Sequence, residues 1–162
     1  MAAGSPAPPR IRPMRAEDAA EVAVLSGQLG YPATTEVVAR RFATFAGRRD
    51  LVALVAEAAD GSLAGWIQAH AETLLESDPI PVIGGLVVRD GARGRGIGRA
   101  LLEAVEAWAA ARGYPGLRVR SNVVRERAHR FYESAGYART KTQHNFTKRL
   151  PGAGGDGGRL DP

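Results

Sequence analysis

The chain has 162 residues, of which 44% are hydrophobic and 24% charged, and its formal net charge is +5. This length and composition are typical of one soluble globular domain. Because the chain contains no cysteine, disulfides, thiolate zinc sites and cysteine nucleophiles are excluded. No apolar run approaches the ~20 residues that cross a bilayer, and the first residues lack a signal-peptide pattern. We therefore expect a cytoplasmic protein without a membrane anchor.

The two ends of the chain differ in composition from the rest. Residues 1–9 and 151–162 are rich in glycine, proline and other small residues, so they have little apolar surface to bury. We expect two disordered ends around one folded domain at 10–150. That domain begins with a predicted strand in RIRPM, a helix from Glu17 to Leu29 ended by Gly30, and a helix from Thr35, as N-cap, to Ala46.

The middle of the chain predicts a hairpin and a third strand. Segments 51–58 and 63–72 are apolar, and the Asp60-Gly61 pair between them favours a tight turn. Strand 82–88 contains two adjacent glycines, which indicate a bulge or a close approach of the backbone. Strand 63–72 places Trp66, Gln68 and His70 on one face, which is either an acceptor-site wall or a covered sheet face.

The remaining elements complete an α/β pattern. They are a helix from Gly96 to Arg112, a strand at 116–122, a helix from Arg125 to Ala135 ended by Gly136, and a strand at 137–150. This order predicts a mixed sheet of about six strands flanked by four helices. Strands 82–88 and 116–122 are joined through a helix, so we expect them to be parallel neighbours.

A block of glycine and arginine, RGRGIG at 93–98, stands where the third predicted helix begins. The start of a helix exposes unpaired N–H groups that attract phosphate, and glycine lets an anion approach the backbone. The block lacks the lysine of a Walker A loop and the third glycine of the dinucleotide fingerprint. It therefore predicts a diphosphate cradle of another type.

Three sequence patterns occur around this cradle. Arg93, Gly96 and Gly98 fit Q/R-x-x-G-x-G/A, and Leu86 and Val88 fit the L-x-V of the preceding strand. Ala128, Phe131, Tyr132, Glu133, Gly136 and Tyr137 fit A-x-x-F/L-Y-E-x-x-G-F/Y. In these motifs, and in the order of its elements, the chain resembles the Gcn5-related N-acetyltransferases (GNAT) over about 10–150.

The resemblance implies a GNAT-like fold and an acyltransferase that uses acetyl-CoA. It implies that Tyr132 protonates the departing thiolate. The cofactor-binding residues that it implies are Leu86, Val87, Val88, Arg93, Gly94, Arg95, Gly96, Ile97, Gly98, Arg99, Asn122, Arg125 and His129. The three histidines show no metal-ligand spacing, and we expect no metal.

The segment from Ser121 to Lys148 resembles one branch of the family more closely. Its S-N-x-x-R-x-x-A-H-x-F-Y pattern and K-x-Q-x-x-F-x-K ending are similar to those of aminoglycoside 6'-N-acetyltransferases. The chain departs from the histone-modifying branch at Val82, where that branch has a glutamate that serves as base. We predict Glu72 as the substitute, with Glu76, Asp78, a water chain or a substrate amine of low pKa as alternatives.

The sequence therefore predicts transfer of an acetyl group to a primary amine of a small molecule, with an aminoglycoside-like amine as one candidate. A protein or peptide N-acetyltransferase is the first alternative. A non-catalytic acyl-CoA-binding or nucleic-acid-binding module is the second, because five arginines cluster at 118–130. No aromatic stacking platform is interleaved with those arginines, so nucleic acid is the weaker partner. A homodimer is also expected, in which the final strand would pair with its copy.

Overall fold

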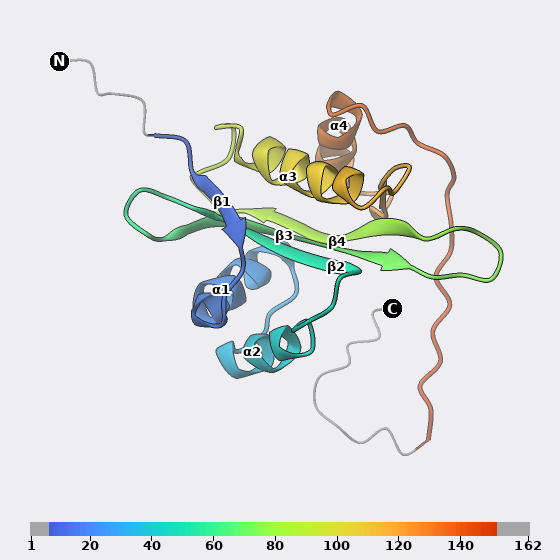
Figure 1. Cartoon of the computed structure of the whole chain (residues 1–162), viewed down its shortest axis with the longest axis horizontal. Helices are drawn as coiled ribbons and strands as arrows, with labels where there is room; N and C mark the ends of the chain where they lie inside the picture. Colours follow the sequence, from blue (N-terminus) through green and yellow to red (C-terminus); the bar gives the residue numbers. More distant parts are fainter. Residues whose placement is uncertain (1–6, 152–162) are drawn as a thin grey trace. The chain divides into compact units, whose positions relative to one another are not determined.

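The computed structural model describes residues 7–151 (Figure 1). The chain divides into two compact units, Met1–Arg120 and Ser121–Pro162. The expected disordered ends lie largely outside the described residues, and residues 7–9 belong to no helix or strand. Among the described helices, none combines the length and apolar character that crossing a bilayer requires.

The first unit is a five-stranded sheet with helices on both sides. Its strands, in spatial and sequence order, are β1 (Arg10–Pro13), β2 (Leu51–Glu57), β3 (Leu63–Glu72), β4 (Ile80–Val88) and β5 (Arg118–Val119). All neighbours are antiparallel except β4 and β5, which are parallel as expected. Helices α1 (Ala19–Leu29) and α2 (Thr35–Ala43) lie on one side of the sheet and α3 (Ile97–Ala111) on the other (Figure 1).

The core of this unit forms on both faces of the sheet. Apolar residues of α1, such as Val22 and Leu25, pack with Val55, Leu63 and Val87 of the strands. On α3, the fully buried side chains occur at helical spacing and include Leu101, Leu102 and Val105. The sheet is therefore held from both sides, which fixes the position of β4.

The second unit contains helix α4 (Glu126–Ser134), which ends before Gly136. The predicted strand at 137–150 is wrong, because residues 138–150 are all exposed and no strand forms there. This segment is mostly polar, with Phe146 and Leu150 as its large apolar residues. It therefore has no apolar face that pairing in a sheet would bury. Within residues 7–151 the sheet has five strands, where about six were expected.

Two helix boundaries also differ from the prediction. A short 3-10 helix, Ala16–Asp18, precedes α1 and takes the place of its first turn. Helix α2 is capped by Thr34 and not by Thr35, because the Thr34 hydroxyl accepts a hydrogen bond from the Val37 N–H at 3.3 Å. The helix ends at Ala43, three residues earlier than expected, and turns lead on toward β2.

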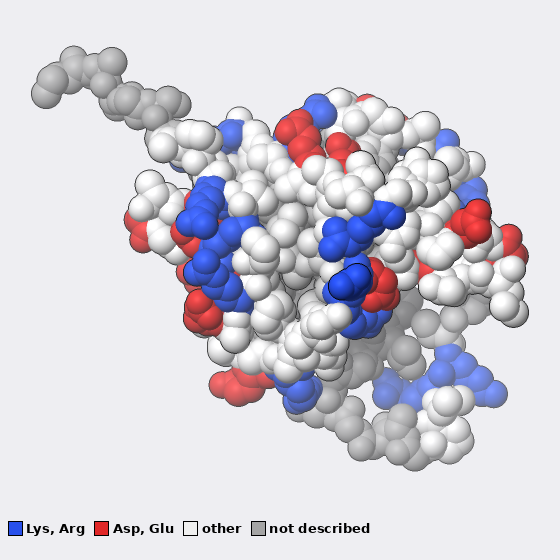
Figure 2. Space-filling view, viewed as in Figure 1, with Lys and Arg blue, Asp and Glu red and all other residues white. Residues whose placement is uncertain are grey.

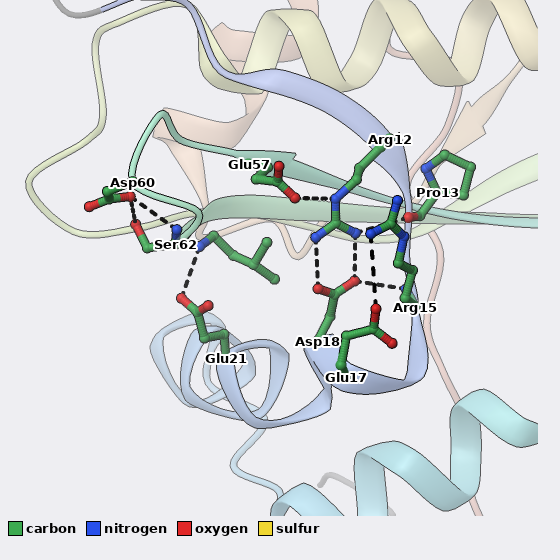
Figure 3. A network of polar contacts seen from close by, with 10 residues as sticks. Arg12, Pro13, Arg15, Glu17, Asp18, Glu21, Glu57, Asp60 and Ser62 are labelled. Atoms are coloured by element: carbon green, nitrogen blue, oxygen red, sulfur yellow. Dashed lines mark hydrogen bonds and ion pairs between the residues drawn. The ribbon is translucent and has the colours of Figure 1, made fainter.

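A buried ion-pair network secures the edge strand β1 (Figure 3). Arg12 and Asp18 are each only 7% exposed, and the Arg12 guanidinium donates two hydrogen bonds to Asp18 at 2.8 and 2.9 Å. Arg12 also donates to Glu57 of β2. Asp18 accepts a further bond from the Arg15 N–H at 2.7 Å. These hydrogen bonds, above all the two from Arg12, lower the pKa of the Asp18 carboxyl.

We expect Asp18→Asn to lower the free energy of unfolding by about 3 kcal/mol, because it leaves the buried Arg12 without its main partner. A lowered native pKa adds stability above the unfolded-state pKa of about 4, and this stability is lost as pH falls through the native pKa. The variant should therefore show a weaker loss of stability toward acid. Urea unfolding across pH 3–7 measures both effects, with the exposed Asp78→Asn as control. A variant as stable as the parent would contradict the structural role of this network.

Candidate active site

The edge of β4 that faces β5 is mostly open. Strand β5 has two residues and pairs only with Val82 and Ile83. On its other side, β4 stays paired with β3 as far as Val88. Within the described chain, no strand therefore covers the edge of β4 from Gly84 to Val88.

The orientation of the backbone groups at this edge follows from the hydrogen bonds to β3. The Arg89 N–H donates to the Ala64 carbonyl at 2.7 Å, so the backbone N–H of residue 89 points toward β3. Backbone groups of successive strand residues point to opposite edges. The N–H and C=O groups of Leu86 and Val88 therefore point to the open edge, and those of Val87 to β3.

The predicted bulge is confirmed and lies at Gly84. Gln68 is opposite Gly85 and Ala69 is opposite Ile83, so Gly84 is the extra residue of β4. Gly85 is covered by an indole ring, because a Cβ built there would lie 2.7 Å from the Cη2 atom of Trp66. Any other residue at 85 would displace this ring.

The predicted cradle forms the turn between β4 and α3. Gly94 and Gly96 both have φ of 78°, the left-handed conformation that favours glycine. A Cβ built on either would meet no heavy atom within 4 Å. Ile97 is buried and anchors the helix, whose first bond runs from the Ala100 N–H to the Gly96 carbonyl at 2.9 Å. The amides of Ile97 and Gly98 come before this first bond, so they are not used by the α-helix and can face an anion.

The arginines of the cradle have different surroundings. Arg93 binds Asp90 at 2.9 Å, and its Nε donates to the Val88 carbonyl at 3.4 Å. It therefore lies at the point where the open edge meets the cradle. Arg95 and Arg99 are exposed, and Gly98 lies half-buried in the first turn of α3.

The predicted base, Glu72, is held by an arginine at the far end of β3. Arg120 donates to both carboxylate oxygens of Glu72, each at 2.7 Å. These hydrogen bonds lower the pKa of Glu72. The alternatives Glu76 and Asp78 lie exposed between β3 and β4. Arg120 was not among the predicted site residues, since spacing along one sequence does not reveal a cross-strand ion pair.

In the second unit, the predicted cofactor residues Asn122 and Arg125 lie in the turn before α4, and His129 lies in the first turns of the helix. The Asn122 side-chain oxygen accepts from the Val124 N–H at 3.2 Å, and its carbonyl accepts from the Arg125 N–H at 3.0 Å. The His129 Nε2 also donates to the Asn122 carbonyl at 3.0 Å. Asn122 and His129 thus fix the local backbone and the start of α4.

Tyr132 lies one turn after Ala128 on α4. Its ring packs against Phe131 and Tyr137, with ring centroids 5.1 and 5.7 Å apart. Burial raises the pKa of the Tyr132 phenol, and the positive charge of Arg125 opposes this only in part. The hydroxyl is therefore protonated at neutral pH and able to donate its proton.

The face of β3 with Trp66, Gln68 and His70 is a covered sheet face at one end. Trp66 packs against the core formed with α1, so this end of the face is covered. Gln68 and His70 are half-buried, and the His70 Nδ1 has no hydrogen-bond partner among the described residues. The face therefore changes from core to polar surface along the strand.

A family model for acetyltransferases of the GNAT family matches residues 22–137. The chain belongs to the acetyltransferase (GNAT) family. No curated protein matches it in a comparison of sequences.

Solved structures of other GNAT proteins share the fold. Aminoglycoside N-acetyltransferase AAC(6')-Iy in complex with CoA is 19% identical, with a TM-score of 0.79 over 93% of this chain and 100% of that one. AAC(6')-Ih from Acinetobacter baumannii is 18% identical, with a TM-score of 0.75 over 87% of this chain and 98% of that one. Glucosamine-6-phosphate N-acetyltransferase from Arabidopsis thaliana is 23% identical, with a TM-score of 0.73 over 85% of this chain and 97% of that one. At these identities, the likeness describes the fold.

We expect Gly96→Ala to weaken CoA binding by at least about tenfold, because a side chain at the cradle holds a phosphate away from the helix amides. Replacing this glycine also strains the backbone, since its φ is positive. Gly113→Ala is a matched control, because Gly113 has φ of 76°, equally open surroundings and a place at the other end of α3. Calorimetry with CoA and urea unfolding separate the two effects. Equal CoA affinity of both variants would remove the cradle from the cofactor site.

Proposed function

We propose that this GNAT protein transfers the acetyl group of acetyl-CoA to a primary amine of a small molecule. The observation that carries this proposal is the open edge of β4, which leads directly into the glycine cradle at the start of α3. The solved GNAT structures include one in complex with CoA, which supports the same cofactor here.

The residues present fit acetyl-CoA at two points. The pantetheine arm carries amide groups, and the outward backbone groups of Leu86 and Val88 can pair with them as a neighbouring strand would. The diphosphate carries negative charge, and the cradle offers helix amides, two open glycines and the guanidinium groups of Arg93 and Arg95. Acetyl-CoA would thus supply the acetyl group at the bulge, near Gly84 and Gly85.

The chemistry needs a donor for the oxyanion and a proton for the leaving thiolate. When the amine attacks the thioester carbonyl, a C–N bond forms and the oxygen becomes negative, and outward N–H groups of β4 can stabilise it. The C–S bond then breaks, and the Tyr132 hydroxyl donates its proton to the thiolate. The attacking amine loses a proton to Glu72, directly or through water.

Nucleic acid is not part of this proposal. Two arginines of the cluster at 118–130 are already paired, Arg120 with Glu72 and Arg130 with Glu126. On the face shown in Figure 2, basic side chains lie in separate groups with acidic side chains beside them. A continuous basic stripe, which would follow a phosphate backbone, is not seen on that face.

The test of the function is CoA release from acetyl-CoA with a panel of primary amines, for the parent and for Tyr132→Phe. If Tyr132 is the acid, its loss should reduce kcat by roughly 10²–10⁴, while the ring and its packing remain. Acetyl-CoA affinity should stay within about twofold, because the hydroxyl acts only in the transition state. Full turnover by the variant, with chemistry rate-limiting, would exclude Tyr132. No turnover by the parent on any amine would contradict the function itself.

The pH profile tests Glu72. Because its pKa is lowered, Glu72 stays ionised from neutral pH down past its usual range, and its protonation cannot produce a limb between pH 6 and 9. We therefore expect Glu72→Gln to lower kcat/KM by about 10² or more without moving any limb in that interval. Glu76→Gln and Asp78→Asn serve as controls. A profile whose neutral limb disappears only in Glu72→Gln would show that Arg120 does not hold the carboxylate in solution.

A further inference from the structure

A cavity of about 320 Å³ lies between α2, the turns after it and the sheet. Every described residue that lines it is alanine, leucine or phenylalanine. Phe42 and Phe45 form one wall, with their rings edge to face at 6.0 Å, and Leu51 and Ala53 of β2 form the floor. Its size is at the lower end of small-molecule sites, and its lining offers no side-chain hydrogen-bonding group.

The strand register places this cavity in line with the bulge of β4. Ala53 is directly opposite Gln68 of β3, and Gln68 is directly opposite Gly85 of β4. Residues opposite each other in a sheet have their side chains on the same face. With strands about 5 Å apart, the cavity floor lies about 10 Å from the position where the acetyl group is proposed to lie.

The row between the cavity and β4 is polar. Gln68 lies on the direct line, and His70 lies beside it, opposite Leu51 of the cavity floor. The buried Nδ1 of His70 has no hydrogen-bond partner among the described residues, so it is available to a bound molecule. Because the Trp66 indole covers Gly85 on this face, a molecule that spans the face passes beside the ring. It meets Gln68 and His70 on β3 and the apolar cavity at its other end.

The carboxylates next to this face are already neutralised. Asp50 is bound by both Nε and Nη2 of Arg48, at 3.1 and 2.7 Å. Glu72 is bound by Arg120 through both of its oxygens. A bound polycation loses water from its ammonium groups and needs carboxylates without other partners to compensate. Asp50 and Glu72 already form ion pairs with arginines.

We infer that the acceptor is a primary amine with an aromatic or aliphatic group about 10 Å from its nitrogen, and that this group fills the cavity beside Phe42 and Phe45. The inference rests on the proposed function and specifies its substrate class. It favours an arylalkylamine over a polyhydroxylated polycation, because apolar walls cannot hydrogen-bond hydroxyl groups.

The experiment measures kcat/KM for phenylalkylamines with one to six methylenes, beside glucosamine and kanamycin. Each methylene that reaches the apolar chamber should raise kcat/KM about fourfold until the length is optimal. Ala43→Phe fills the cavity from an exposed helix position, and Ala107→Phe is its control on α3, away from the cavity. We expect Ala43→Phe to reduce kcat/KM for 6-phenylhexylamine at least about tenfold and Ala107→Phe to leave it unchanged.

Saturation-transfer NMR of 6-phenylhexylamine with the CoA-saturated protein tests the cavity without turnover. Binding to the parent and to Ala107→Phe, with loss in Ala43→Phe, supports the inference. Absence of binding to the parent, or equal binding to all three proteins, overturns it. Faster turnover of glucosamine or kanamycin than of every phenylalkylamine also overturns it and leaves the proposed acetyl transfer intact. Absence of CoA release with all amines contradicts the acetyl transfer instead.

Discussion

The structure depends on a mismatch in length between two parallel strands. β5 has two residues and β4 has nine, so β4 runs on with one edge paired and the other open. Backbone N–H and C=O groups that leave water need partners, and at this edge no strand of the described chain supplies them. The other features near the site act on this edge. The core holds β4 from both faces, the bulge at Gly84 bends β4, and the cradle follows the end of β4.

Two kinds of charge pairing have different roles in the molecule. The Arg12 network is buried and joins β1, the first helical turn and β2, so it acts on stability. The Arg48 and Arg120 pairs are more exposed and lie at the other end of the sheet, so they contribute little to stability. Each of them neutralises a carboxylate on the face beside the cavity, which bears on the acceptor that we infer.

Much of the first unit could be predicted because its signals are local. The Gly84-Gly85 pair indicated the bulge, Asp60-Gly61 the hairpin and the apolar spacing of α3 its buried face. The strand at 137–150 was wrongly predicted, because its polar sequence offers no face to bury. The Arg120–Glu72 pair joins residues 48 apart, and the cavity joins α2 to β2. Such contacts depend on register and packing, which one sequence does not display.

The close fit of Trp66 over Gly85 has a consequence for how this sequence can change. The two positions lie on neighbouring strands, and the indole occupies the space that any side chain at 85 would need. A side chain at 85 therefore either displaces the indole or needs a smaller residue at 66. The two positions are therefore coupled, and the free-energy effects of substitutions at 66 and 85 are expected not to add.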